Sequence, residues 1–500
     1  MGVRRSVTAA RNAIMAVVQV IVSGIVLFLL YRYLLHTIGP EQVGVWAIVL
    51  ATASASRISE MGFAGSAVKF TARYIARGKK DSASDVVQTT IITIATVLAF
   101  VLAVSYPVVI WLIGVLVPVA NILGALAILP YALVSVWIGA VAGVFMSGLD
   151  GCQRVDLRAR VAILAAITFL GFTLTFVPQH GLVGLAWAQI GQGVLMLLAS
   201  WVLLRRELPA LPLLPRRWQY SLFHEMFQYG VNFQVVSIVT MLFEPTTKAL
   251  MAKFGGLTST AYYEMASRMV SQVRALLVSA NQAMVPQVAE LHENEPEQIS
   301  KVYSDSYRIV FFLALLLFVG VALVVPLMSE LWIGHYEKTF VTYSILLIAG
   351  LWLNTLSGPA YFVNLGTGLL RWNTLAHVTI GILNVILGYS LGVVLGGEGV
   401  ALGYVLALVI GSSLVILGYQ RDHQIPLAEL LPSESRRLFF SCCTGLLSTW
   451  AVFRFLEVPQ NVLGKTGLSL VICTIVIGPA FWMHSLRARI TSLSLAAFYK

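Results

Sequence analysis

Two arginines lie deep inside segments that are otherwise apolar and long enough to cross a membrane. Arg57 lies midway along residues 43–66, and Arg274 lies midway along residues 259–287. A charged side chain near the centre of a bilayer is costly, so it indicates a functional role when no simpler explanation fits. The planar guanidinium group binds two phosphate oxygens at once, and a low dielectric strengthens that pairing. Arg57 and Arg274 therefore predict a binding site for an anion that carries phosphate.

Three further cations are candidates for the same site, and each has a simpler interpretation. Arg32 and Lys248 lie near the ends of their expected helices, where a long side chain can reach the membrane surface instead. Arg268 lies four residues after Glu264, so these two side chains could form a structural ion pair. We expect Arg32, Lys248 and Arg268 to join Arg57 and Arg274 in one basic cavity.

Residues 259–287 also predict one polar helical face, which carries Glu264, Arg268, Arg274 and Asn281. A polar face this long does not suit lipid, so we expect it to line a water-filled cavity. The acids of this cavity could couple transport to a proton or Na⁺, or they could balance the arginines. The polar residues expected in the cavity are Glu60, Glu244, Glu264, Asn281 and Gln282.

The composition indicates a membrane protein. Of the 500 residues, 58% are hydrophobic and 11% are charged, whereas soluble domains contain about 25% charged residues. A soluble core cannot bury this much apolar surface, but a bilayer can. In a soluble protein the net charge of +11 would indicate nucleic-acid binding; here we attribute it to basic loops and expect no nucleic-acid partner. The four cysteines lack the spacing of a metal site, so we expect no metal and no cofactor.

Apolar segments of membrane-crossing length predict an all-α integral membrane protein with about 14 transmembrane helices. Residues 107–118 are also apolar and either extend the third helix or re-enter the membrane. The expected segments are 13–35, 43–66, 85–106, 120–147, 158–177, 182–204, 225–250, 259–287, 307–329, 339–363, 374–395, 399–419, 437–456 and 466–486. Most of the 33 Lys and Arg residues fall in alternate loops, which predicts that both termini are cytoplasmic.

The first twelve segments predict a duplicated six-helix unit. Residues Phe145–Val161 resemble Phe362–Val378, and Gly171 aligns with Gly388. Because six helices return the chain to the same side, the two copies should be lobes related by an axis along the membrane normal. The expected division is an N-terminal lobe at 1–204, a cytoplasmic linker at 205–224, a C-terminal lobe at 225–420, and two extra helices with a cytoplasmic tail at 421–500.

The run LLYRYLLHTIGPEQVGVWAIV and the following SEMGFAGSAVKFTARYIARGKKD resemble the start of the polysaccharide-biosynthesis flippases of the multidrug/oligosaccharidyl-lipid/polysaccharide exporter superfamily. The resemblance implies transport of undecaprenyl-diphosphate-linked oligosaccharides to the outer leaflet. The related lipid II flippases keep essential arginines on helices 1, 2 and 8, so the resemblance implies that Arg32, Arg57 and Arg274 bind the diphosphate. Many oligosaccharide flippases have twelve helices; the fourteen expected here are shared with the lipid II flippases, whose extra pair forms a lipid groove.

Together, these features predict a flippase of the inner (plasma) membrane that works by alternating access and is not an enzyme. Its expected partners are a lipid-linked glycan, membrane lipids and the polysaccharide polymerase or export machinery. One alternative is a cation-coupled drug or small-molecule antiporter of the same superfamily, which would need an acidic cavity. A membrane enzyme is a second alternative, but the sequence has no HExxH or paired-carboxylate motif and no large extramembrane loop.

Overall fold

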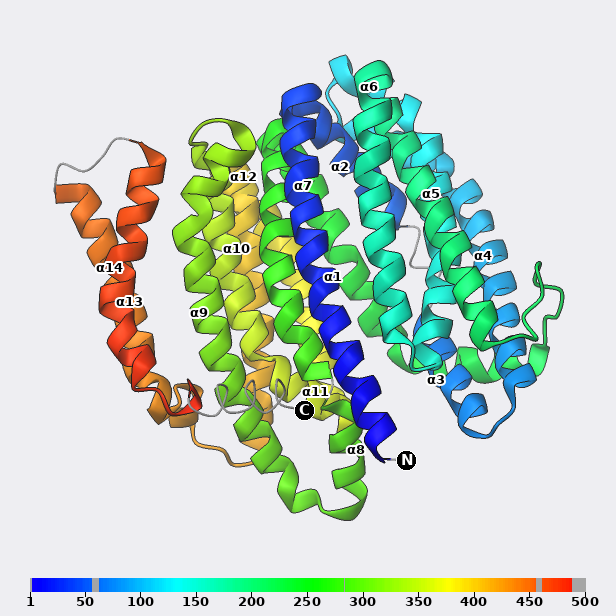
Figure 1. Ribbon diagram of the computed structural model, residues 1–500. Helices are drawn as coiled ribbons and strands as arrows, with labels where there is room; N and C mark the ends of the chain where they lie inside the picture. The colour runs from blue at the N-terminus through cyan, green and yellow to red at the C-terminus, as the bar shows by residue number, and fades with distance from the viewer. Residues whose placement is uncertain (1, 56–62, 283, 456–460, 488–500) are drawn as a thin grey trace. The chain divides into compact units, whose positions relative to one another are not determined.

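The computed structural model describes residues 2–55, 63–282, 284–455 and 461–487, and among these it contains helices and turns but no β-strand (Figure 1). The expected all-α fold is therefore confirmed. In chain order the helices are α1 (Gly2–Thr37), α2 (Gly39–Ala55), α3 (Phe63–Ala76), α4 (Lys80–Leu116), α5 (Val119–Gly151), α6 (Val155–Glu207), α7 (Tyr220–Gln282), α8 (Val285–Asn294), α9 (Ile299–Ile333), α10 (Lys338–Leu356), α11 (Gly358–Thr367), α12 (Arg371–Asp422), α13 (Arg436–Phe455) and α14 (Val462–Trp482).

Three helices are too long for a single crossing of the membrane. α6, α7 and α12 contain 53, 63 and 52 residues, whereas about 20 residues cross a bilayer. Each is interrupted by a glycine with positive φ, at Gly181, Gly256 and Gly396. We count each of these helices as two crossings, α10 with α11 as one crossing, and the short α8 as none; α2 and the start of α3 both fall within the expected segment 43–66, on either side of residues 56–62. The helices then correspond to the fourteen segments expected from the sequence.

The structure decides the role of the apolar residues 107–118. α4 continues through Pro107 to Leu116, and α5 begins at Val119 directly after Pro118. These residues therefore extend the third helix and do not re-enter the membrane. A proline within a membrane helix is tolerated because neighbouring groups satisfy the backbone carbonyl that it leaves free.

Two equivalent hairpins support the internal repeat. A Cβ atom at Gly184 would lie 2.3 Å from the carbonyl oxygen of Phe176, and one at Gly399 would lie 2.0 Å from that of Leu391. Residues eight apart are about 12 Å apart along a straight helix, so the chain turns back on itself at both places. The two contacts lie 215 residues apart in the sequence. Only glycine allows this close approach, which explains why Gly184 and Gly399 align.

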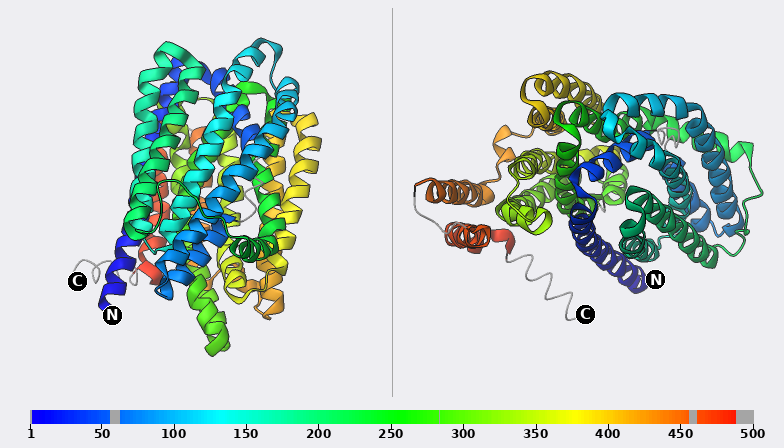
Figure 2. Two further views of the ribbon diagram at one scale, coloured as in Figure 1. Left: turned by 90° about the vertical axis from the view of Figure 1, so that its right-hand side faces the viewer. Right: turned by 90° about the horizontal axis from the view of Figure 1, so that it is seen from above.

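The chain divides into two compact units. The first contains Met1–Glu264 and Gly388–Val400. In this unit α5 packs along α6, and α1 packs on α6, while α3 and α4 pack on α5 (Figures 1 and 2). The second contains Met265–Leu387 and Ala401–Lys500. In this unit α9 packs on α10, α8 packs on α11, and α13 and α14 form a hairpin against α9. The lobe boundaries expected from the sequence stay a prediction.

The linker that follows α6 is fixed to α4 within the first unit. The Oε1 atom of Gln88, a buried residue, accepts hydrogen bonds from the backbone N–H groups of Arg216 and Arg217 at 3.1 and 3.3 Å. The indole N–H of Trp218 donates to Thr93 Oγ1 at 3.1 Å. The linker is therefore held by side chains of α4, which satisfy backbone groups that have no helical partners.

Candidate anion-binding site

Lys248 forms a buried ionic cluster within the first unit. Its Nζ atom lies 2.6 Å from Glu244 Oε1 and 2.7 Å from Glu264 Oε2. Lys248 and Glu264 are each 3% exposed, whereas Glu244 lies at the edge of the cluster with a largely exposed side chain. Glu244 lies one helical turn before Lys248. Glu264 reaches Lys248 because the turn at Gly256 lies eight residues from each of them.

A tyrosine of α1 completes this cluster. The hydroxyl of Tyr31 donates to Glu264 Oε1 at 3.5 Å, and Tyr31 is 1% exposed. The Tyr31 ring lies 6.4 Å from that of Trp46, whose indole N–H donates to Gln189 Oε1 at 3.4 Å. Glu264 is therefore held by a cation and a phenol, as a buried carboxylate requires. The sequence showed Lys248 and Glu264 as candidates, but it did not show that they pair or that Tyr31 joins them.

Two cations of the first unit are exposed: Arg32 on α1, which the sequence predicted for the site, and Lys253 on α7. The Lys253 ammonium lies 5.4 Å from the ring of Phe254 and 5.2 Å from that of Tyr389, a cation–π arrangement. Lys248, in contrast, is fully buried, so its interpretation as a side chain that reaches the membrane surface was wrong. The repeat aligns Arg32 with Lys248, yet the two residues have opposite environments.

Arg274 forms a second polar cluster, within the second unit. It lies on the last part of α7, and its Nε atom is buried with no hydrogen-bond partner among the residues that the structure describes. Tyr361 of α11 and Tyr404 of α12 lie within electrostatic range of its guanidinium, as does His377 of α12. The rings of Tyr361 and His377 meet edge to face, with their centroids 5.6 Å apart.

No carboxylate pairs with Arg274 in the described part of the chain. Arginine stays protonated in proteins, so a half-buried positive charge faces phenol and imidazole groups, with no ionic counterpart among the described residues. Sequence reasoning identified Arg274 but missed Tyr361, His377 and Tyr404. In the sequence, these three residues differ from their neighbours only in being polar aromatic residues within apolar helices. Such residues are common, so they do not by themselves indicate a site.

The remaining predicted residues have differing environments. Asn281 is 4% exposed and accepts a hydrogen bond from Ser306 Oγ at 3.3 Å. A Cβ atom at Gly358 would lie 2.8 Å from its amide nitrogen, so Asn281 packs tightly at the start of α11. Gln282 and Arg268 are exposed. Arg57 and Glu60 lie outside the described residues, and their predicted roles stay predictions.

The long apolar helices, the two hairpins closed at Gly184 and Gly399 and the charged residues on α7 together define a multi-pass helical membrane protein. A sequence profile of the family described as polysaccharide biosynthesis protein matches residues 9–292, and the chain belongs to that family.

Solved structures of known exporters have the same fold. The lipid II flippase MurJ, in an inward closed conformation, matches with a TM-score of 0.73 and 14% identity, over 96% of this chain and 99% of that one. A multidrug resistance transporter of the MATE family, in the MOP superfamily, matches in its inward-facing conformation with a TM-score of 0.67 and 17% identity, over 84% and 99% of the two chains. A MOP superfamily transporter from Pyrococcus furiosus, described as having a binding pocket of reverse polarity, matches with a TM-score of 0.61 and 15% identity, over 83% and 95%. No curated protein matches by sequence.

Proposed function

We propose that this protein is a flippase that moves a polyprenyl-diphosphate-linked oligosaccharide from the cytoplasmic to the outer leaflet by alternating access. The observation that carries the proposal is the environment of Arg274, a half-buried cation whose Nε atom is fully buried and which has no carboxylate partner in the described part of the chain. Burial of an unpaired charge is costly unless a ligand supplies the opposite charge. A diphosphate supplies that charge and accepts hydrogen bonds from the guanidinium fork.

The basic character of this cluster favours the flippase over a cation-coupled antiporter. An organic cation would be repelled by Arg274 and would find a phenol and an imidazole where it needs a carboxylate. Membership of the polysaccharide biosynthesis family also supports a lipid-linked glycan as cargo. The fold is shared by a lipid II flippase and by a superfamily member with a pocket of reverse polarity, so it is compatible with a phosphate-bearing substrate.

We assign different roles to the other predicted residues. Lys248 reaches a diphosphate only when Glu264 releases it, so the pair is a candidate for coupling: a proton taken up by Glu264 would free the Lys248 ammonium. Glu244 also contacts Lys248 in the structure, and we propose that it balances the ammonium when Glu264 is protonated. Arg32, Arg57 and Arg268 remain candidates for guiding the anionic head, with Glu60, Asn281 and Gln282 as polar lining. The polysaccharide polymerase or export machinery would receive the product.

The proposed topology places both termini in the cytoplasm and the protein in the plasma (inner) membrane. With the inside negative, outward movement of an anion is favourable by about 2.3 kcal/mol per charge per 100 mV. Two phosphate charges that cross the whole potential would therefore gain about 4.6 kcal/mol. The membrane potential alone is thus a sufficient driving force for the proposed direction.

The decisive experiment measures binding of a polyprenyl-diphosphate oligosaccharide to the purified protein in nanodiscs. We expect Arg274→Gln to weaken binding about 10- to 100-fold, the effect of losing a charged hydrogen-bond pair, and Arg57→Gln/Arg274→Gln to remove most of it. Arg371→Gln is the matched control, because Arg371 is exposed at the start of α12 and lies against Trp372. Equal binding by wild type and both arginine variants, or binding of organic cations in place of the lipid, would refute the proposal.

A further inference from the structure

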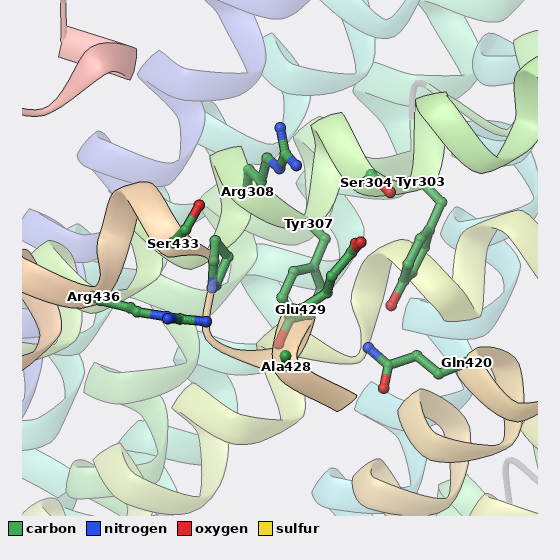
Figure 3. Close-up of a pocket in the computed structure, with 10 residues that line it drawn as sticks. Tyr303, Ser304, Tyr307, Arg308, Gln420, Ala428, Glu429, Ser433 and Arg436 are labelled. Carbon is green, nitrogen blue, oxygen red and sulfur yellow. The ribbon is translucent and has the colours of Figure 1, made fainter. Parts of the chain in front are cut away.

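A polar cavity of about 180 Å³ lies in the second unit, where α9 begins, α12 ends and the chain enters α13 (Figure 3). Its lining carries charges of both signs. Arg308, Arg436 and Ser433 contribute donors, whereas Glu429 contributes a carboxylate. The Nε atom of Arg308 lies 3.8 Å from Glu434 Oε1, and that of Arg436 donates to the carbonyl of Leu431 at 3.3 Å, so the remaining guanidinium N–H groups are the ones a ligand can use. Figure 3 shows Arg436 and Ser433 on one side of the cavity, Gln420 and Tyr303 on the other, and Glu429 between them. The cavity therefore offers separate places for an anionic and a cationic group.

An apolar groove of about 310 Å³ continues from this cavity and shares Tyr307 with it. The hydroxyl of Tyr307 donates to the carbonyl of Leu430 at 3.0 Å, which fixes the turn before α13 against α9. One helical turn further along α9, Phe311 lies 6.1 Å from Trp352 and 6.2 Å from Phe439. The charged cavity therefore continues into a groove lined by aromatic and aliphatic side chains.

Three buried polar atoms along this path have no hydrogen-bond partner among the described residues. They are Oε1 of Gln420, a residue that is 1% exposed, Nε1 of Trp352 and the hydroxyl oxygen of Tyr303. An unpaired buried polar group is costly, so native proteins rarely leave one without a reason. Gln420 lines the polar cavity and Trp352 lines the groove. An occupant of the path would need a donor at the first atom and an acceptor at the second.

We propose that the cavity and groove bind one phospholipid with a phosphoethanolamine headgroup. Its phosphate pairs with Arg308 and Arg436, and its ammonium donates to Glu429 and to Oε1 of Gln420. An ester carbonyl accepts from the Trp352 indole, and one acyl chain fills the groove. A choline headgroup has no N–H to donate, and a glycerol headgroup has no cation for Glu429. The lipid is a resident ligand, distinct from the cargo of the proposed transport.

Native mass spectrometry of the purified protein with dioleoyl lipids tests the headgroup. We expect wild type to retain one phosphatidylethanolamine about tenfold more than phosphatidylcholine or phosphatidylglycerol, and Glu429→Gln to bring these ratios near one. Arg308→Gln/Arg436→Gln should lower retention of all three lipids. Arg437→Gln and Arg421→Gln are matched controls, because both residues are exposed and neither lines the cavity.

A second pair of variants tests whether the lipid occupies the groove. Both substitutions are at partly exposed leucines, so neither removes a buried side chain from the core. Leu417 lines the groove and is 42% exposed, so Leu417→Trp should fill the groove and abolish retention. Leu406→Trp, on the same helix outside the groove, should leave retention unchanged. Equal retention of the three lipids by wild type, or unchanged ratios in Glu429→Gln, would overturn the proposal.

The cargo itself is the competing occupant. If a polyprenyl-diphosphate lipid displaces phosphatidylethanolamine one for one from wild type, and this depends on Arg308 and Arg436, the cavity belongs to the transported substrate and the proposal is wrong. If displacement does not occur, the lipid site stands apart from transport. Because retention is measured without transport, failure of the flippase proposal would leave this result intact.

Discussion

Lys248 and Arg274 are both cations of α7 that lie away from solvent, Lys248 buried and Arg274 half-buried, yet their surroundings differ in one decisive respect. Lys248 is held by two glutamates within 2.7 Å. Arg274 faces tyrosines and a histidine, with no carboxylate partner in the described part of the chain. The glutamates of the protein neutralise the charge of Lys248. The charge of Arg274 has no carboxylate partner among the described residues, so a bound anion can neutralise it.

This difference separates two explanations that look the same in a sequence. A buried ion pair gains enough attraction to offset desolvation only when both partners are present, so its loss is felt mainly as instability. A buried cation without a partner already carries that cost in the resting protein. Its removal should be felt mainly as lost binding. The predictions that follow test whether stability and binding divide in this way.

Removal of the Lys248 charge should have the largest effect on stability. In Lys248→Met, Glu264 stays buried without its cation, and we expect a loss of about 3–5 kcal/mol. Lys248→Met/Glu264→Gln removes both charges and should recover most of that loss. Thermal unfolding of the purified variants in one detergent measures both effects. The comparison fails if the single variant is as stable as wild type, or if the double variant is no better than the single one.

Arg274→Gln should show the opposite pattern. Affinity for a polyprenyl-diphosphate lipid should fall about 10- to 100-fold. The unfolding temperature without ligand should stay the same or rise, because an unpaired buried charge is gone. Added lipid should then stabilise wild type but not the variant, since a ligand that binds only the folded state raises its stability. A large loss of stability in the ligand-free variant would show that Arg274 has a structural partner, and the contrast with Lys248 would disappear.

The turn that creates the Lys248 cluster can be disturbed without touching a charge. A Cβ atom at Gly44 of α2 would lie 2.1 Å from the carbonyl oxygen of Leu257, directly after the Gly256 turn. Gly44→Ala should therefore destabilise the protein by about 1–3 kcal/mol, as overpacking does, and weaken the coupling between Lys248 and Glu264 in a double-mutant cycle. Gly24→Ala is the control, because nothing lies within 4 Å of its Cβ position. Equal effects of the two substitutions would show that the α2–α7 contact does not position the cluster.

Apolar length and charge placement were enough to predict the helical fold. The long helices coincide with predicted segments, singly or, for α6, α7 and α12, in pairs, because a bilayer permits few alternatives for apolar stretches of this length. The paired glycines also carried a readable signal: Gly184 and Gly399 align because both allow a hairpin to close. The sequence left the role of residues 107–118 open, since length alone does not distinguish a longer helix from a re-entrant segment.

The candidate site was harder to predict because partners depend on tertiary contacts. Arg274 could be recognised as a costly charge and Lys248 as a candidate near a helix end, but neither position says which of the two is neutralised by the protein. Glu264 meets Lys248 only because the chain turns at Gly256. From the sequence, one possible partner of the Glu264 carboxylate was Arg268, which lies four residues away on the same helix. Local spacing describes neighbours on one helix face and is silent on neighbours from another helix.

Lys253 is a cation at the surface, unlike Lys248 and Arg274. Its substitution should have the smallest effect on stability and on lipid binding. Its ammonium lies over Phe254 and Tyr389, and an exposed cation–π contact contributes about 0.5–1 kcal/mol. Lys253→Met removes the charge but keeps an unbranched apolar stem, and it should lower stability by no more than that, with no change in lipid affinity. Thermal unfolding and the lipid-binding assay used for Arg274→Gln measure both quantities. If Lys253→Met weakens diphosphate binding as much as Arg274→Gln does, exposed cations bind the cargo as well as buried ones, and an unpaired, buried environment is not what marks the anion site.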